Sequence, residues 1–257
     1  MTVSKEFLFA LAAAAERETL PRFRQNGRIE NKLAAGFDPV TEADQAAELA
    51  IRRLIEKEFP AHGILGEEHG SVRLDSRHVW VIDPIDGTRA FISGIPVWGT
   101  LIGLKEDHIA VTGLMAQPFT GETFYALHGE AFLQHRGFTR RLKCRETENL
   151  GEATLLTTTP SLFKDAARER FDNLESQVRL SRYGCDCYAY AMLAAGNIDL
   201  VVETGLNPYD IVAMIPIIEN AGGVVRTWDG GRPEGGGNIV AAASEALCEQ
   251  AMAVMNG

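Results

Sequence analysis

The stretch VWVIDPIDGT, residues 79–88, is an apolar run that ends in two carboxylates, a glycine and a threonine. This pattern predicts a buried strand that ends at Asp83 and is followed by a tight turn. The carboxylates of Asp83 and Asp86 can both point at one ion, and the turn exposes the Ile85 carbonyl as a third oxygen. Hard cations such as Mg²⁺ prefer such oxygen ligands. For an isolated pair, the alternative is a turn whose aspartates bind nearby backbone N–H groups.

Three further acidic clusters lie at the ends of apolar elements. Residues 66–68, Gly-Glu-Glu, follow a short apolar run, and alone they are typical of a charged strand end. Thr41 and Asp44 open a predicted helix and resemble a capping box. Asp210 lies three residues after Asn207, where a carboxylate favours a helix N-terminus. Each cluster has a structural explanation, but these explanations do not predict that all the clusters lie at element ends, where sites are built.

Three motifs together resemble the inositol monophosphatase family of Mg²⁺-dependent phosphomonoesterases. They are GEE at 66–68, DPIDGT at 83–88 and YD…ENAGG at 209–223, and they occur in the family's order over nearly the whole chain. The resemblance implies a layered α/β fold, an αβαβα sandwich of the sugar-phosphatase type. It also implies hydrolysis of a small phosphate monoester with two to three Mg²⁺ ions in each site.

The resemblance assigns the metal ligands residue by residue. Glu67, Asp83 and the Ile85 carbonyl would hold the first, activating ion. Asp83, Asp86 and Asp210 would hold a second. Glu67 would also reach a third, weaker ion through water.

The same resemblance implies the catalytic residues Asp44, Thr88 and Glu67. Thr88, paired with Asp44, would orient and deprotonate the attacking water. The backbone amides of Gly87 and Thr88, at the start of a helix, would bind the phosphate. Lys32 is the nearest candidate for the lysine that commonly precedes the Thr41–Asp44 motif in this family.

Three other stretches look most like the histidinol-phosphate phosphatase branch of the family. They are DGTRAFISG at 86–94, WGTLIGL at 98–104 and DCYAYAMLAAGNIDLV at 186–201. Arg89 belongs to the first, where the inositol-specific branch usually has a neutral residue. Its guanidinium would clamp phosphate oxygens or position an acid. The alternative is a surface arginine at a helix start.

Histidinol phosphate carries an ammonium and an imidazole, so its pocket is expected to offer acids. Glu203, seven residues before Asp210, matches the family's substrate-binding carboxylate, and Asp186 is a second candidate. Glu203 would bind inositol hydroxyls equally well, and the alternative for Asp186 is a helix N-cap.

The expected function is therefore a metal-dependent histidinol-phosphatase of histidine biosynthesis. The first alternative is an inositol-1-phosphate or broad sugar-phosphate monophosphatase. An alternative of another class is a regulatory partner of the transcription machinery, as some bacterial relatives of this family are. Homologues are generally homodimers, and the same state is expected here.

Composition narrows the class of protein. The chain has 257 residues, a formal net charge of −10 and four cysteines. The acidic balance argues against nucleic acid as the main ligand, since phosphate-backbone binding needs concentrated Lys and Arg. No apolar run reaches the ~20 residues needed to span a bilayer. The scattered cysteines and the amphipathic pattern of residues 4–20 favour a cytoplasmic protein over a secreted one.

The pattern divides the chain near residue 145. Residues 1–145 are predicted to form an α+β half that carries the metal-binding turn. It should hold helices at 4–20 and 41–59, a loop or ribbon between them, and an antiparallel meander from residue 79 to 134. Residues 146–257 are predicted to form an α/β half with the substrate-binding residues. In it, the segment 207–223 should be one helix kinked at Pro216.

Overall fold

The computed structural model describes residues 3–25, 29–31 and 39–256. Its helices are α1 (Lys5–Thr19), α2 (Glu42–Glu58), α3 (Thr88–Ile92), α4 (Asp165–Glu175), α5 (Asp186–Ala194), α6 (Pro208–Ile211), α7 (Met214–Glu219) and α8 (Glu245–Asn256), with 3-10 turns η1 (Leu150–Glu152) and η2 (Pro160–Leu162). Its strands are β1 (Ile29–Asn31), β2 (Pro39–Thr41), β3 (Gly63–Gly66), β4 (Ser71–Val72), β5 (His78–Asp86), β6 (Gly99–Glu106), β7 (Ile109–Gln117), β8 (Glu122–Leu127), β9 (Glu130–His135), β10 (Phe138–Arg141), β11 (Thr154–Thr157), β12 (Leu180–Tyr183), β13 (Leu200–Leu206), β14 (Val224–Thr227) and β15 (Gly237–Ala242).

The helix pair α1 and α2 forms the first layer. Ser4 caps α1 by accepting the Phe7 N–H, and Thr41 caps α2 in a capping box with Asp44. The apolar faces of both helices pack on one face of a sheet, in a cluster that includes Leu11 and Ile51. The two predicted helices are therefore confirmed. Of the predicted ribbon between them, β1 and β2 pair antiparallel, while residues 32–38 lie outside the described part.

The second layer is an eight-stranded sheet with the order β10-β9-β8-β7-β6-β5-β3-β4. Strands β5 to β10 follow one another antiparallel, so the predicted meander is confirmed. The apolar run before Glu67, whose end was interpreted as a charged strand end, forms β3, but its parallel pairing with β5 through Gly63 and Val79 was not predicted. Four residues with a glycine at each end are too short a run to show a period.

Strand β5 does not end at Asp83, as predicted, but continues to Asp86 through a β-bulge. Asp83 pairs with Leu101 and Asp86 with Gly99, so the β5 side holds one extra residue between these pairs. Pro84 has no N–H to give to the ladder, and its carbonyl instead accepts the Thr100 hydroxyl at 2.8 Å. The bulge re-aims the end of the strand, which is a common device beside active sites.

The second sheet has five strands in the order β12-β11-β13-β15-β14. Strand β11 pairs parallel with β12 and β13, whereas β15 pairs antiparallel with β13 and β14. The predicted single helix over 207–223 is wrong, because the structure has α6 and α7 with a break at 212–213. The break lies one turn before Pro216, whose ring clashes with the carbonyl four residues earlier.

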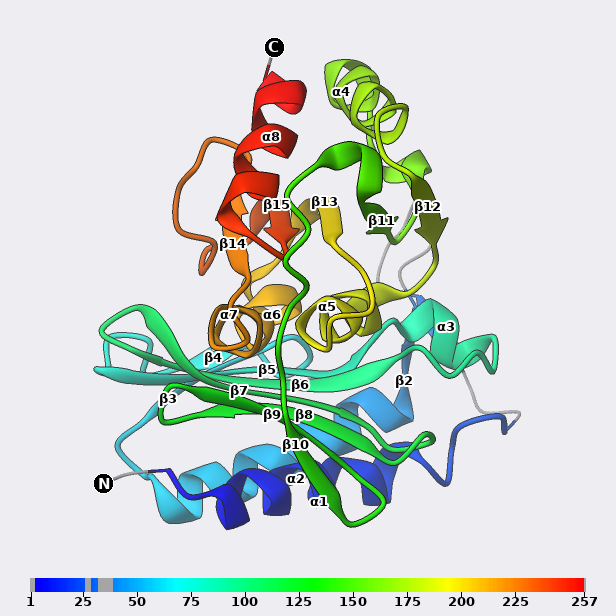
Figure 1. Cartoon of the computed structure of the whole chain (residues 1–257). Coiled ribbons are helices and arrows are strands. Elements are labelled where there is room, and N and C mark those ends of the chain that lie inside the picture. Colours follow the sequence, from blue (N-terminus) through cyan, green and yellow to red (C-terminus); the bar gives the residue numbers. More distant parts are fainter. Residues whose placement is uncertain (1–2, 26–28, 32–38, 257) are drawn as a thin grey trace.

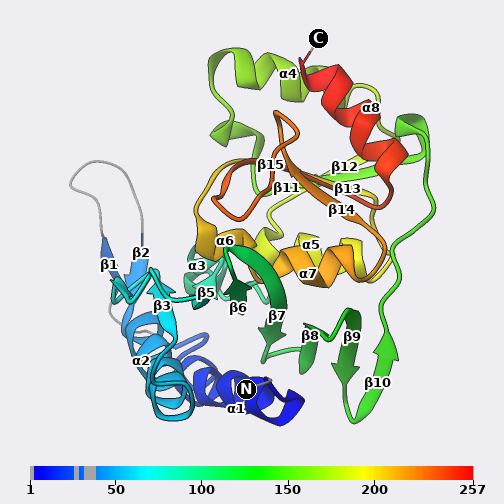
Figure 2. The ribbon, with the colours of Figure 1, turned by 90° about the vertical axis from the view of Figure 1, so that its left-hand side faces the viewer.

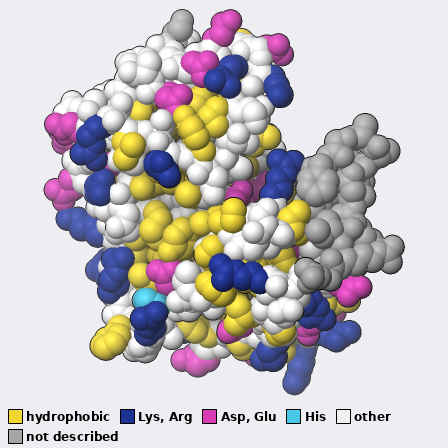
Figure 3. All heavy atoms as spheres, turned by 90° about the vertical axis from the view of Figure 1, so that its right-hand side faces the viewer, with side chains coloured by type: hydrophobic (Ala, Val, Ile, Leu, Met, Phe, Trp, Pro, Cys, Tyr) yellow, Lys and Arg dark blue, Asp and Glu magenta, His cyan; other side chains and the backbone are white. Residues whose placement is uncertain are grey.

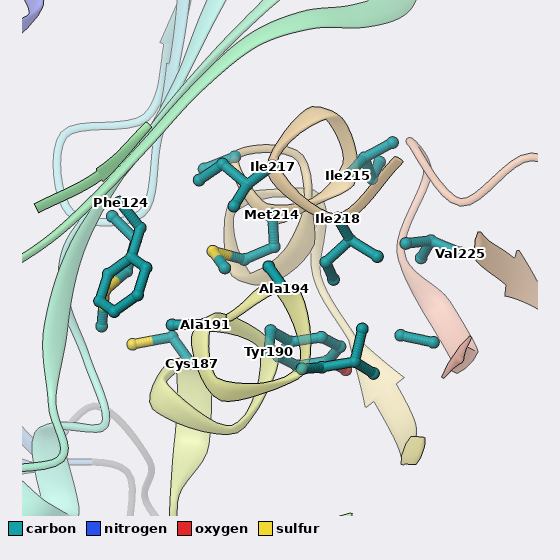
Figure 4. Close-up of a cluster of buried hydrophobic side chains, with 14 of the residues drawn as sticks. Phe124, Cys187, Tyr190, Ala191, Ala194, Met214, Ile215, Ile217, Ile218 and Val225 are labelled. Carbon is teal, nitrogen blue, oxygen red and sulfur yellow. The ribbon is translucent and has the colours of Figure 1, made fainter. Parts of the chain in front are cut away.

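Helices α5 and α7 lie between the two sheets, and α4 and α8 cover the outer face of the second sheet (Figures 1 and 2). Figure 4 shows Phe124 of the first sheet, Tyr190 of α5 and Ile218 of α7 in one buried cluster. A separate cluster joins α4 and α8 to the second sheet, with Phe171 and Leu247 fully buried. The order helix, sheet, helix, sheet, helix confirms the predicted αβαβα sandwich. The division into halves at residue 145 remains a proposal.

Candidate metal centre and active site

A cleft of about 300 Å³ lies where the end of β5 meets α5, α6 and β13. Predicted site residues from both halves of the sequence line it: Glu67, Asp86, Gly87, Thr88, Arg89, Asp186, Glu203 and Asp210. The other predicted residues, Asp44, Asp83 and Ile85, are buried next to it, with exposed fractions of 0, 2 and 0%. Residues more than a hundred positions apart are thus brought to one place.

The acidic cluster consists of Asp86 and Asp210, which line the cleft, and Asp83, which is buried beside it. One carboxylate oxygen from each residue lies within 4.8 Å of the others. The β5 bulge supplies two of these residues. The first turn of α6 supplies the third, whose carboxylate also accepts the Asn207 N–H at 2.7 Å. The sequence interpretation placed these carboxylates at one ion, and the fold brings them to one point.

Burial and mutual repulsion raise the pKa values of carboxyl groups in the acidic cluster. The pKa of Asp83 lies well above its usual value because the carboxyl is buried and faces Glu67, Asp86 and Asp210. The pKa of Asp86 is also raised, by burial and by Asp186 and Asp210. Like charges gathered in a buried place are costly unless a cation neutralises them. The donor set is all oxygen, which suits a hard divalent cation and excludes a soft one.

The turn after the bulge orients the neighbouring groups. Asp83 Oδ1 accepts the Ile85 N–H at 3.0 Å, and the Ile85 carbonyl accepts the Thr88 hydroxyl at 3.1 Å. Gly87 has a φ of 85°, and a Cβ there would lie 3.1 Å from an Asp186 oxygen. Glycine is therefore required both by the backbone conformation and by the close approach of Asp186.

Asp44 lies in the first turn of α2 and is completely buried. Burial raises its pKa to about 6, although Thr41 donates to it from both its N–H and its hydroxyl. Its second oxygen, Oδ1, has no hydrogen-bond partner among the described residues. The expected direct pairing with Thr88 is therefore not formed, because the Thr88 hydroxyl donates to the Ile85 carbonyl.

Glu67 lies on the turn between β3 and β4, and its side chain lines the cleft. Its N–H donates to the Ile82 carbonyl at 3.2 Å, which ties the turn to β5 just before Asp83. The Glu67 carboxylate is close enough to raise the pKa of both Asp83 and Asp44. Lys32 lies outside the described residues.

The C-terminal wall of the cleft consists of Thr158, Asp186 and Glu203. Glu203 is 1% exposed and accepts the Thr158 N–H at 2.5 Å and the Thr157 hydroxyl at 3.1 Å. Burial nevertheless raises its pKa to about 7. Asp186 also has a raised pKa, caused by burial and opposed by the Arg89 guanidinium.

Asp186 is not the N-cap of α5, so the alternative explanation of this residue as a helix N-cap is excluded. Cys185 is the N-cap residue of α5, and it makes no side-chain cap. Asp186 has a φ of 43°, in the left-handed region that Asp adopts more readily than most other non-glycine residues. Arg89 is an exposed residue of α3 that lines the cleft within the electrostatic range of Asp186. Its role at the site remains a proposal.

Among the lining residues that the sequence interpretation did not assign to this site, Thr158 and Tyr190 offer polar groups. Thr158 follows β11 directly, and its place at the carboxyl end of a parallel strand could have identified it. Tyr190 also lines the cleft from α5, with 3% exposure and a hydroxyl that has no partner within the described part of the chain. Its apolar helical surroundings offered no signal in the sequence.

A second hollow, of about 640 Å³, lies at the opposite end of β5. Three of its charged or titratable groups lie together, since Arg77 binds Glu106 at 2.8 Å and Glu106 lies 3.6 Å from His78. None of the predicted site residues that the structure describes lines this hollow.

Comparisons with known proteins agree with this geometry. A sequence model of the inositol monophosphatase family matches residues 2–256, and the chain belongs to that family of phosphatases. The chain is 41% identical to the bifunctional phosphatase IMPL2 of Arabidopsis thaliana over 87% of its own length and 64% of that protein. It is 33% identical to a histidinol-phosphatase of Mycobacterium tuberculosis over 92% of both chains. It is 34% identical to an inositol-1-monophosphatase of Caulobacter vibrioides over 79% of this chain and 80% of that one.

Solved structures show the same fold. An inositol monophosphatase from Zymomonas mobilis superposes with a TM-score of 0.87 at 38% identity and 98% coverage of both chains. A Thermotoga maritima inositol monophosphatase superposes with a TM-score of 0.85 at 28% identity, covering 98% of this chain and 96% of that one. Within the described residues, no helix combines the length and the apolarity that crossing a bilayer requires.

Proposed function

We propose that this chain is a Mg²⁺-dependent phosphomonoesterase whose preferred substrate is L-histidinol phosphate. The observation that carries the proposal is the pairing of two acidic surfaces in one cleft. The acidic cluster suits a divalent cation, and the partly buried Asp186 and the buried Glu203 suit a cationic organic group. In the absence of a bound cation, the carboxylates of both surfaces would repel a phosphate group.

The residues present fit a resident metal. Asp83, Asp86 and Asp210 offer converging carboxylate oxygens, and Glu67 and the Ile85 carbonyl lie beside them as further ligands of two to three ions. When bound, Mg²⁺ would neutralise the phosphate, lower the pKa of the attacking water and stabilise the leaving alkoxide.

The chain's own residues would then orient the reactants. Asp44, with a pKa of about 6 and one unpartnered oxygen, is mostly ionised at pH 7 and would accept a proton from the attacking water. Thr88 would align that water through its hydroxyl, and the Gly87 and Thr88 amides would hold phosphate oxygens. Water would attack phosphorus in line, with no covalent enzyme intermediate.

The C-terminal wall would select the alcohol part of the substrate. Histidinol phosphate carries an ammonium and an imidazole, and Asp186 and Glu203 would bind these cationic donors. Arg89, beside Asp186, would clamp a phosphate oxygen or hold that carboxylate in place. Relatives named histidinol-phosphatase, in Mycobacterium tuberculosis, Chlorobaculum parvum and Streptomyces coelicolor, support this choice. The reaction would serve histidine biosynthesis in the cytoplasm.

The test compares kcat/KM with Mg²⁺ for L-histidinol phosphate and myo-inositol-1-phosphate. A preference of about a hundredfold, equivalent to ~2.7 kcal/mol of transition-state binding, is expected for histidinol phosphate. Comparable values would instead support the alternative, a broad monophosphatase, which the inositol-1-monophosphatase relatives favour. Turnover of neither substrate would reject both.

Two further proposals concern partners. Apolar side chains gather across the middle of the face in Figure 3, and a patch of this kind is typical of a self-association surface. We therefore expect a homodimer, which light scattering would measure.

A relative in Pasteurella multocida, named Nus factor SuhB, is 30% identical over 88% of this chain and 86% of that one. Recovery of RNA polymerase subunits in a pull-down would support a regulatory role in transcription.

A further inference from the structure

Helix α2 holds a buried ion pair next to the turn that carries Glu67. Glu48 is completely buried and Arg52 is 7% exposed, one helical turn apart. Arg52 Nε donates to Glu48 Oε1 at 2.6 Å. Neither residue lines the cleft, so neither is available to substrate. A buried carboxylate and guanidinium are costly to desolvate, and the helix is already anchored by its apolar residues.

The pair is hydrogen-bonded to the backbone of the Glu67 turn. The Glu48 carboxylate accepts the Glu68 N–H at 2.7 Å and the His69 N–H at 3.1 Å. Arg52 donates to the Gly70 carbonyl. These charge-assisted bonds fix consecutive peptide groups directly after Glu67, from an element that does not otherwise belong to the turn.

The other side of the turn is equally constrained. A Cβ on Gly66 would overlap Glu48 Oε1 and lie 2.7 Å from an Arg52 nitrogen, so this glycine and the ion pair require each other. The Gly66 N–H donates to the Gly70 carbonyl and the Glu67 N–H to the Ile82 carbonyl. Glu67 is therefore held between α2 on one side and β5 on the other.

We propose that Glu48 is a positioning residue that sets the affinity of the site for its metal by fixing the backbone beneath Glu67. The proposal rests on the proposed function only in taking Glu67 as a metal ligand. Helix α2 also carries Asp44 in its first turn. The same helix therefore orients Asp44 directly and Glu67 through Glu48.

The experiment measures Mn²⁺ binding by electron paramagnetic resonance in the wild-type chain and in Glu48→Gln, without substrate. The side-chain amide that this variant introduces must turn a donor toward the Glu68 or His69 N–H or toward Arg52, so the turn should shift. We expect Mn²⁺ affinity to fall tenfold or more. The Mg²⁺ concentration for half-maximal turnover should rise by a similar factor, with a smaller change in kcat at saturating Mg²⁺.

Asp199→Asn is the matched control. Asp199 is also completely buried, and it accepts a backbone N–H from Thr154 at 2.8 Å and an Arg145 bond at 3.2 Å, outside the cleft. The variant should lower the melting temperature while leaving Mn²⁺ affinity unchanged. An equal loss of affinity in Asp199→Asn would overturn the proposal, since general destabilisation would then explain both variants.

Glu48→Asp covers the case in which Glu48→Gln does not fold. The aspartate keeps a counter-ion for Arg52 but is one methylene too short to reach both amides, so Mn²⁺ affinity should fall less, in the same direction. Wild-type affinity in a folded Glu48 variant overturns the positioning role. Failure of the proposed function gives a different result, namely Mn²⁺ binding without turnover of any phosphate monoester in the wild-type chain.

Discussion

The acidic cluster and the C-terminal wall line the same cleft but are built in different ways. Most of the cluster comes from one short bulged strand end, where Asp83 and Asp86 are three residues apart. The wall takes Thr158, Asp186 and Glu203 from three elements of the second half of the chain. The comparison indicates that a local motif can encode the reaction chemistry, whereas the choice of substrate depends on how distant elements pack.

The largest effect is expected from Asp86→Asn, which removes one carboxylate of the acidic cluster. We expect kcat to fall about a thousandfold or more, equivalent to ~4 kcal/mol, because the proposed metal site would lose a ligand. The Asn oxygen can still accept the Cys187 N–H, which Asp86 accepts at 2.7 Å, so the fold should persist. Steady-state kinetics with Mg²⁺ would measure kcat, and a thermal melt would show whether the fold persists. A near-wild-type kcat would remove the metal assignment.

Glu203→Gln should weaken substrate selection by the C-terminal wall and leave the acidic cluster intact. The variant keeps one acceptor oxygen for the Thr158 N–H, and its side-chain amide can donate to the Thr157 hydroxyl oxygen. It loses the charge that is proposed to bind the cationic group. We expect kcat/KM for histidinol phosphate to fall about a hundredfold, ~2.7 kcal/mol, and that for p-nitrophenyl phosphate to change little. Glu234→Gln, at a buried carboxylate outside the cleft, is the control. Equal losses on both substrates would place Glu203 in the chemical step rather than in substrate choice.

Arg89 lies between the two regions, and Arg89→Ala tests to which it belongs. If Arg89 sets specificity, kcat/KM should fall about tenfold more for histidinol phosphate than for p-nitrophenyl phosphate, ~1.4 kcal/mol. Arg89→Lys, which keeps the charge but not the planar fork, should recover only part of the loss. A uniform loss on both substrates would show that Arg89 only holds phosphate.

The one effect expected on stability rather than on catalysis follows from the raised pKa of Glu203, about 7 against an ordinary value of 4.5. A raised pKa means that the folded chain favours the protonated form. The stabilisation from this group is therefore full below pH 4.5 and is lost as the pH rises through 7. Glu203→Gln, always neutral, should be more stable than wild type at pH 8 by about 1–3 kcal/mol without metal. Urea unfolding at pH 5 and pH 8 measures the free energy of unfolding of the variant and of the wild type. The prediction would be contradicted if the difference between the two proteins were the same at both pH values.

Much of the fold could be predicted because its signals are local. Ser4 and Thr41 begin α1 and α2, and the apolar residues behind them recur at helical spacing. The hairpins from β5 to β10 follow from alternating runs joined by short turns. Pro216 predicted a disturbance in its helix but not its extent, because a kink and a full break differ only in how the neighbouring elements pack around the freed carbonyl.

Other features depend on partners that are distant in the sequence. Strand β12 is mostly exposed, so its residues show no burial pattern, and only the pairing of Thr154 with Leu180 makes it a strand. Thr88 was expected beside Asp44, but its hydroxyl donates to the Ile85 carbonyl three residues back. A hydroxyl can take any acceptor in reach, and spacing alone does not rank them.

The family and the layered fold could be predicted from the sequence alone, and so could the acids of the candidate metal centre, because the residues of each motif are close along the chain. Which other side chains complete the cleft depends on how distant elements pack. This packing brings Asp186 against Gly87, buries Glu203 beside Thr158, and places the Glu48–Arg52 pair under the turn that carries Glu67. The physical reason is that burial and charge set a carboxylate's role, and both arise only when distant elements pack together.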